Sequence, residues 1–136
     1  MNEQTLTHGR VARYCKPSSL DEQGSPTSAA FQRRPTEVYL SAFWLEFFQH
    51  VHEKMRIQAV KRAMAQRRFT VKPRGQFAVL DIEQSTHYIF KEVAEQIVCR
   101  AMNLPHCGLF HDGDDLLIAE LLAECVQANY DVKGLG

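Results

Sequence analysis

Long apolar runs are missing from this sequence: no stretch approaches the roughly 18 to 20 apolar residues that a membrane-spanning helix requires. The opening residues, 1–10, are polar and lack the apolar centre that a secretory signal carries. Net charge is missing too, since 16 basic residues balance 16 acidic ones. We therefore expect a cytoplasmic protein that makes no use of a membrane. The charge balance also argues against a general nucleic-acid coat protein.

Motifs that carry a known chemistry are missing as well. The sequence contains no P-loop, no G-x-G-x-x-G, no H-E-x-x-H and no G-x-S-x-G. Its four cysteines, at positions 15, 99, 107 and 125, are scattered and show neither the paired spacing of a zinc site nor a disulfide framework. These absences predict reduced thiols, no cofactor and no bound metal.

The composition is that of an ordinary globular domain. Hydrophobic residues make up 45% and charged residues 24% of the 136 positions, which is enough for one domain with its own core. We expect a flexible N-terminus over 1–9, a single α+β domain over 10–130, and a polar C-terminal tail over 131–136. The segment 16–35 is rich in Pro, Ser and Gly and reads as a long loop. Whether that loop is ordered without a partner stays open.

Short strands are predicted at four places. Residues 10–15 alternate loosely, 37–40 are typical of a short strand, and 77–82 are nearly all apolar, as in a central strand. Residues 107–110 are a further short candidate. The segment 97–102 fits a strand or the continuation of a helix, because periodicity alone does not separate the two.

Three helices complete the predicted fold, a short mixed or antiparallel sheet packed against one long and two shorter helices. The longest is expected over 42–68, with Ser41 as its N-cap and an apolar stripe at helical spacing. A second is expected over 86–96 with Ser85 as N-cap, and a third over 115–129. The run of acidic residues at 112–115 suits the N-terminus of the third helix, where the helix dipole favours negative charge.

Half of the chain's basic residues fall within 54–80, a window that contains no Asp or Glu. The eight side chains of this basic ridge are Lys54, Arg56, Lys61, Arg62, Arg67, Arg68, Lys72 and Arg74. Such a ridge can neutralise the phosphates of nucleic acid or meet an acidic protein surface, and arginine suits bidentate phosphate contacts. The alternative is a solvated outer face with no partner.

His106, Cys107 and His111 are the weak candidates for catalysis. A His-Cys pair between a strand and a helix start is similar to the loop of cysteine-based phosphatases, in which an Arg six residues after the Cys holds the phosphoryl oxygens. Gly113 stands at that position here, so we reject the match. The same stretch is rich in metal-ligand atoms, and the spacing of His106 and His111 is permissible for zinc, but a third ligand would have to come from elsewhere in the chain. A buried Cys beside a surface His is the simpler interpretation.

Several short stretches resemble short bacterial proteins of unknown function. They comprise 13–21, Ala30-Phe31, Tyr39-Leu40-Ser41, Trp44-Leu45-Glu46, and Gly108 with Asp114-Asp115 before an apolar helix. The resemblance implies a bacterial cytoplasmic origin and carries no activity.

Two functional hypotheses follow from the sequence. The first is a non-catalytic accessory or adaptor protein that docks a partner protein or nucleic acid through the basic ridge. Its basic middle and acidic third, 112–124, would also permit self-association. The alternative is a small enzyme acting on a phosphate-bearing or nucleotide substrate, with a cleft that gathers Arg13, Tyr14, His106 and His111.

Overall fold

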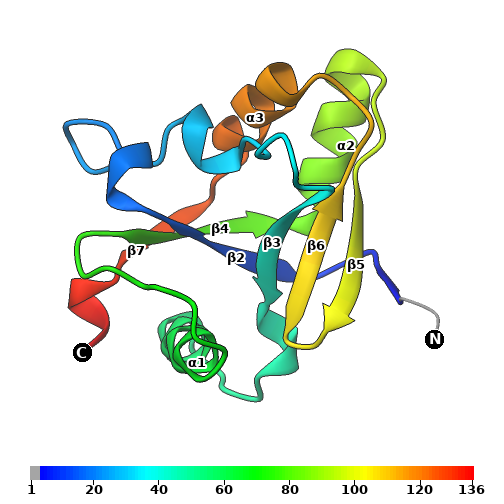
Figure 1. Cartoon of the computed structure of the whole chain (residues 1–136). Coiled ribbons are helices and arrows are strands. Elements are labelled where there is room, and N and C mark those ends of the chain that lie inside the picture. Colours follow the sequence, from blue (N-terminus) through cyan, green and yellow to red (C-terminus); the bar gives the residue numbers. More distant parts are fainter. Residues whose placement is uncertain (1–3) are drawn as a thin grey trace.

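A single antiparallel sheet of seven strands organises the molecule, in the spatial order β1-β5-β6-β3-β2-β4-β7. The computed structural model describes residues 4–136. The strands are β1 (Thr5–Leu6), β2 (Arg10–Cys15), β3 (Tyr39–Trp44), β4 (Gln76–Asp81), β5 (Val98–Asn103), β6 (His106–Phe110) and β7 (Ala128–Asp131). One face of the sheet carries α2 (Ile82–Val93) and α3 (Asp115–Glu124), and the other carries α1 (Glu53–Gln66) (Figure 1). The predicted small α+β domain is confirmed.

Two apolar cores lie on opposite faces of the sheet, because neighbouring residues of each strand point to opposite sides. In β4, Ala78 and Leu80 join the core under α2 and α3, while Phe77 and Val79 join the core against α1. A strand buried on both faces reads as a continuous apolar run, which is why β4 was recognisable in the sequence. Among the helices within residues 4–136, none is long and apolar enough to cross a bilayer.

The sheet divides into two parts where β2 meets β3. Strands β2 and β4 pair over six residues and β3 and β6 over five, whereas β2 and β3 pair only at Val11↔Trp44 and Ala12↔Phe43. Beyond these two pairs the strands separate and run across one another (Figure 1). This divergence leaves room between the end of β2 and the start of β3.

The long loop follows a defined path above this gap. It contains the short 3-10 helices η1 (Pro17–Ser19) and η2 (Ser28–Phe31), and an isolated bridge joins Leu20 to Pro26. Asp21 Oδ1 accepts hydrogen bonds from two backbone amides, which closes the turn between the two 3-10 helices. Phe31 is fully buried in the core that α2 and α3 cover. The loop is therefore anchored to the domain by its own apolar side chain.

The prediction of one helix over 42–68 is wrong in its first half. Ser41 does not cap a helix but lies within β3, where it pairs with Gly108 of β6. The chain then forms the 3-10 helix η3 (Leu45–Phe47), and α1 starts only at Glu53. Of the apolar residues that gave this segment its helical spacing, Trp44 lies in β3, Phe47 lies in η3, and Val51 precedes α1 and is 90% exposed.

Smaller differences concern the ends of elements. The helix expected from residue 86 begins at Ile82 and is capped by Asp81, whose side chain accepts from Gln84 N at 2.8 Å. Ser85, the expected cap, lies buried inside that helix. The ambiguous segment 97–102 is a strand, β5. The third helix does begin at residue 115, with Asp114 as its cap, but it ends at Glu124.

Both chain ends extend the sheet within the described residues. Leu6, in the segment expected to be flexible, is buried because β1 pairs with β5 as an edge strand. Residues 1–3 of that segment lie outside the described part of the chain. The expected polar tail instead follows β7 with the 3-10 helix η4 (Lys133–Leu135), and its Val132 and Leu135 are buried against α1. Buried apolar side chains, sparse in the sequence, hold this end in place.

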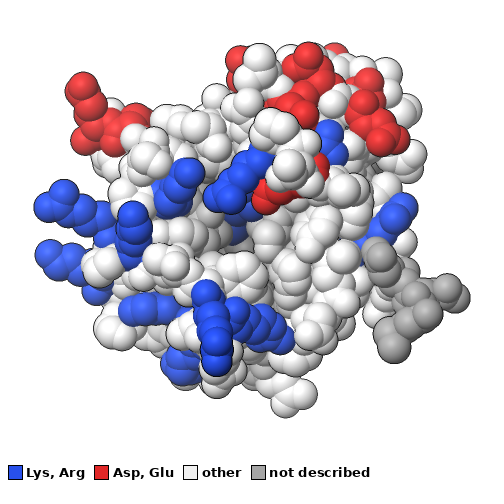
Figure 2. Space-filling view, in the orientation of Figure 1, with Lys and Arg blue, Asp and Glu red and all other residues white. Residues whose placement is uncertain are grey.

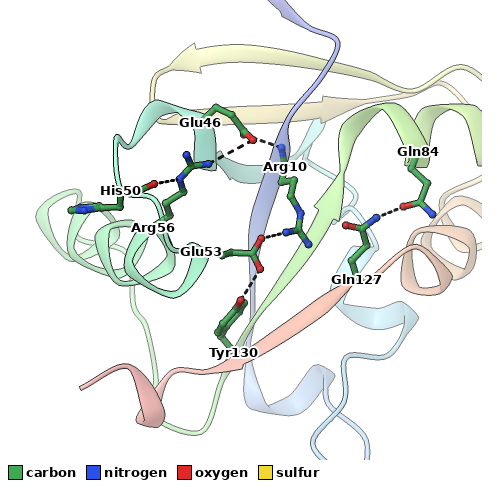
Figure 3. Close-up of polar contacts among 8 residues, drawn as sticks. All are labelled: Arg10, Glu46, His50, Glu53, Arg56, Gln84, Gln127 and Tyr130. Carbon is green, nitrogen blue, oxygen red and sulfur yellow. Dashed lines mark hydrogen bonds and ion pairs between the residues drawn. The ribbon is translucent and has the colours of Figure 1, made fainter.

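Polar contacts tie α1 to the sheet (Figure 3). Glu53, the first residue of α1, accepts a hydrogen bond from Tyr130 Oη at 2.6 Å and forms an ion pair with Arg10. Glu46 accepts from the backbone N of Arg10 at 2.9 Å and lies 3.8 Å from Arg56 Nη1. The N-terminal end of α1 is thus fixed to β2 and β7.

Candidate anion-binding cavity

A cavity of about 590 Å³ opens where β2 and β3 diverge. Its walls come from the end of β2, the long loop, β3, and the C-terminal end of α1 with the loop that follows. The polar and aromatic side chains that line it include Arg13, Tyr14, Lys16, Gln32, Arg33, Arg34, Glu37, Ser41, Phe43, Phe69, Thr70 and Lys72. This volume falls within the range of small-molecule sites, about 300 to 1,000 Å³.

Positive charge dominates the lining. Five of the lining residues are Lys or Arg, whereas Glu37 is the one acidic side chain among them. Arg33 is partly neutralised, because its Nε lies 2.7 Å from Asp115 Oδ1. Figure 2 shows Lys and Arg side chains gathered around the hollowed face and over α1, while the acidic side chains lie mainly over α2 and α3. The cavity therefore sits within a basic region of a strongly polarised surface.

Arg13 is the central cation of this cavity. Its Nε donates to the carbonyl of Ala30 at 2.5 Å and its Nη1 donates to the carbonyl of Ser41 at 2.7 Å. Burial lowers the pKa of Arg13 below its ordinary value, while the negative charge of Glu37 works in the opposite direction. Within residues 4–136 no carboxylate lies within ion-pair distance of Arg13. A partly desolvated guanidinium thus lacks a close counter-charge.

Tyr14 fixes the opposite wall. Its hydroxyl accepts a hydrogen bond from the backbone N of Lys72 at 2.9 Å, which ties the loop after α1 to β2. Gly75 permits this approach, since a Cβ at that position would lie 2.6 Å from Tyr14 Cε1 and 2.9 Å from the carbonyl oxygen of Cys15. A side chain at residue 75 would push this wall out of place.

His106 reaches the cavity through Ser41. Its Nε2 lies 2.7 Å from Ser41 Oγ, and its ring packs beside Phe43 and Phe69, both of which line the cavity. Burial and the nearby positive charge of Arg67 lower the pKa of His106 below its ordinary value of 6.5. The imidazole is therefore neutral at pH 7.

The other two catalytic candidates lie elsewhere. His111 is buried, with Nε2 at 3.6 Å from Asp115 Oδ1, and its pKa is lowered by burial and by Arg33. Cys107 is fully buried on β6 beside Cys99, which together with burial raises the pKa of its thiol. A protonated thiol in the core is a poor nucleophile. Of the predicted cleft, Arg13 and Tyr14 line the cavity, His106 adjoins it, and His111 does not take part.

The basic ridge is only partly continuous with the cavity. Lys72 lines the cavity, and the positive charge of Arg67 lowers the pKa of His106. Arg56 points back to the preceding segment, where its Nε donates to the carbonyl of His50 at 2.7 Å. Lys54 lies at the far end of α1, about 20 Å from Arg67 at the helical rise per residue. The C-terminal half of the ridge is thus the half that borders the cavity.

No pattern in the sequence marks Lys16, Arg33, Arg34 or Ser41 as site residues, although all four line the cavity. Lys16 and Arg34 lie at the two ends of the long loop, and their only signal is basic charge at the ends of a segment whose middle carries only the acidic Asp21 and Glu22. Ser41 was assigned to a helix cap, and only the pairing of β3 with β6 brings it to His106.

This chain matches no protein-family model, and neither a curated protein nor a solved structure is significantly similar to it. The site is therefore interpreted from its own chemistry. Within residues 4–136, no group of three or more His, Cys, Asp or Glu side chains is arranged to hold a metal ion. The chemistry available at the cavity is that of guanidinium, ammonium, hydroxyl and imidazole groups beside aromatic rings.

Proposed function

We propose that this protein binds single-stranded nucleic acid across its basic face, with one nucleotide of the strand seated in the cavity. The observation that carries the proposal is Arg13, whose guanidinium is held by backbone carbonyls and lacks a carboxylate partner within the described chain. Burying a charge is costly unless an opposite charge compensates it. A phosphate group would provide that compensation and match the planar guanidinium with two hydrogen bonds.

The cavity also offers surfaces for a base. Phe69 is 41% exposed and lines the cavity together with Tyr14 and Phe43. Aromatic side chains beside cations are the usual means of binding single strands, because every base can stack on a ring. Phe77, the other aromatic residue near the ridge in sequence, is fully buried and is not available for stacking. Phe69 is the stacking group that this proposal requires.

Nucleic acid is favoured here over an acidic protein partner because of the shape of the site. A protein surface that docks through carboxylates would contact exposed cations such as Arg62 and Arg68, but it would leave Arg13 in the hollow without a partner. A phosphate on a flexible strand can enter the hollow while the neighbouring phosphates meet the end of the ridge. The adaptor hypothesis is thereby narrowed to a strand-binding protein.

The direct test is fluorescence anisotropy with an end-labelled single strand of mixed sequence. Wild-type protein should bind, and its affinity should fall steeply as salt rises, because each phosphate contact releases counterions. Charge reversal at the cavity rim, Arg34→Glu with Lys72→Glu, should weaken binding at least about tenfold. The matched control reverses Lys91 and Arg100, two exposed cations on α2 and β5, and should change affinity little. Equal losses in both double variants, or no binding by the wild type, would overturn the proposal.

A further inference from the structure

Ser41 and His106 form a close hydroxyl–imidazole pair at the edge of the cavity. Ser41 Oγ lies 2.7 Å from His106 Nε2, and within residues 4–136 the hydroxyl makes no other side-chain hydrogen bond. Ser41 also lines the cavity in which the proposed ligand lies. A serine hydroxyl that is hydrogen-bonded to a neutral imidazole is the arrangement that activates serine as a nucleophile.

The imidazole is held in place from three sides. The ring of His106 lies with its centroid 5.5 Å from Phe43, 6.0 Å from Tyr39 and 6.3 Å from Phe69. Its strand is fixed as well, since His106 pairs directly with Phe43 across β6 and β3. Arg67 and Tyr39 are the charged and titratable groups that face it, and the charge of Arg67 disfavours a second proton on the ring. The neutral ring is therefore available as a base.

Arg13 supplies the third group that such chemistry needs. Its Nη1 donates to the carbonyl oxygen of Ser41, so its guanidinium lies beside the residue that carries the nucleophile. Fixed positive charge next to an attacked phosphorus stabilises the negative charge that spreads over the phosphoryl oxygens. Nucleophile, base and cation thus meet at one cavity.

We propose that Ser41 and His106 cleave a phosphodiester bond of the bound strand, with Ser41 as nucleophile and His106 as general base. This inference rests on the proposed function, which supplies the strand. Ser41 Oγ forms a bond to phosphorus while its proton passes to His106 Nε2, and the bond from phosphorus to the leaving oxygen breaks. The leaving oxygen takes the proton from His106. Water then attacks the phosphorus of the serine phosphodiester, which still carries the rest of the strand. His106 accepts a proton from this water and returns it to Ser41 Oγ as that oxygen leaves, so that one diester and one water give a monoester and an alcohol.

A covalent probe tests the nucleophile without a substrate. Diisopropyl fluorophosphate forms an oxygen–phosphorus bond with an activated serine and releases fluoride, and peptide mass spectrometry locates the adduct. We expect labelling at Ser41, and His106→Gln should slow it at least about a hundredfold, the lower end of general-base catalysis. Ser18→Ala is the matched control, because Ser18 is an exposed serine outside the cavity lining. In the Ser18→Ala protein, Ser41 should be labelled at the wild-type rate.

Cleavage of the end-labelled strand is the second measurement, and it separates this inference from strand binding. Ser41→Ala should still bind the strand but release no product, when it and the wild type are purified in parallel. Wild-type protein that binds the strand, yet leaves Ser41 unlabelled and the strand intact, would overturn the catalytic inference and leave the binding proposal standing. Equal cleavage by Ser41→Ala would overturn it as well. Failure of the wild type to bind any strand would overturn both proposals.

Discussion

Replacing Glu53 tests how the basic helix α1 is held to the sheet. Glu53→Ala removes the acceptor of the 2.6 Å hydrogen bond from Tyr130 and the ion-pair partner of Arg10. A hydrogen bond to a charged group contributes about 1.5 to 3 kcal/mol, and loss of one partner from a fully buried ion pair costs about 3 to 5 kcal/mol. The side chains of Arg10 and Glu53 are 32% and 21% exposed, so solvent screens the ion pair between them. We expect Glu53→Ala to lower the free energy of unfolding by about 2 to 3 kcal/mol.

The assay is urea unfolding followed by the fluorescence of Trp44, the one tryptophan in the chain. Tyr130→Phe should cost about 1 kcal/mol, and a double-mutant cycle with Glu53→Ala should give a coupling energy of about 1 kcal/mol. Glu92→Ala, at an exposed position on α2, is the control and should stay within about 0.5 kcal/mol of wild type. A loss below about 0.5 kcal/mol for Glu53→Ala, or zero coupling to Tyr130, would refute this account of how α1 is anchored.

Two further predictions concern the cavity wall and a buried histidine. Gly75→Ala places a Cβ 2.6 Å from Tyr14 Cε1, so we expect a loss of about 1 to 3 kcal/mol in urea unfolding, whereas Gly134→Ala, with its nearest neighbour at 3.9 Å, should change little. Equal effects of the two alanines would contradict the close packing. Burial and Arg33 lower the pKa of His111, so its contribution to stability is fully present above its ordinary pKa of 6.5 and is lost as pH falls through the lowered value. His111→Gln should therefore reduce the loss of stability between pH 7.5 and pH 5, measured in urea, and an unchanged pH dependence would argue against a neutral buried imidazole.

The elements that the sequence predicts well are those in which local signals and burial agree. Strand β2 has the bounds expected, and the bounds of β4 differ from the expected ones by one residue. Strand β4 is predictable because a nearly unbroken apolar run is typical of a strand buried on both faces. The start of α3 is also as expected, since acidic residues there serve as cap and dipole partner. In these three elements, residues close together in the chain are sufficient to determine the secondary structure.

The segment 39–52 has the residue spacing of a helix but folds as a strand and a 3-10 helix, for a physical reason. Apolar residues such as Trp44, Phe47 and Val51 satisfy a helical period, and only the pairing of β3 with β2 and β6, strands distant in sequence, makes the start of this segment a strand. The candidate site depends on the same pairing. Arg13, Tyr14 and His106 were expected in one cleft and do meet near the cavity, but Ser41 joins them only through the register of β3 and β6. Lys16 and Arg34 reach it through the path of the long loop, which is determined by contacts distant in sequence such as the burial of Phe31.

The most direct measurement of the central claim is strand binding by Arg13→Gln, a variant that lacks the guanidinium but keeps an amide donor for the neighbouring carbonyls. Its fold is checked by circular dichroism and urea unfolding before anisotropy titrations over a range of salt concentrations. We expect an affinity at least about tenfold weaker, and a salt dependence shallower by about 0.7 in the slope of log K against log salt, because one contact to a single strand is lost. A folded Arg13→Gln protein with the affinity and the salt slope of the wild type would contradict the claim that this cavity receives a phosphate.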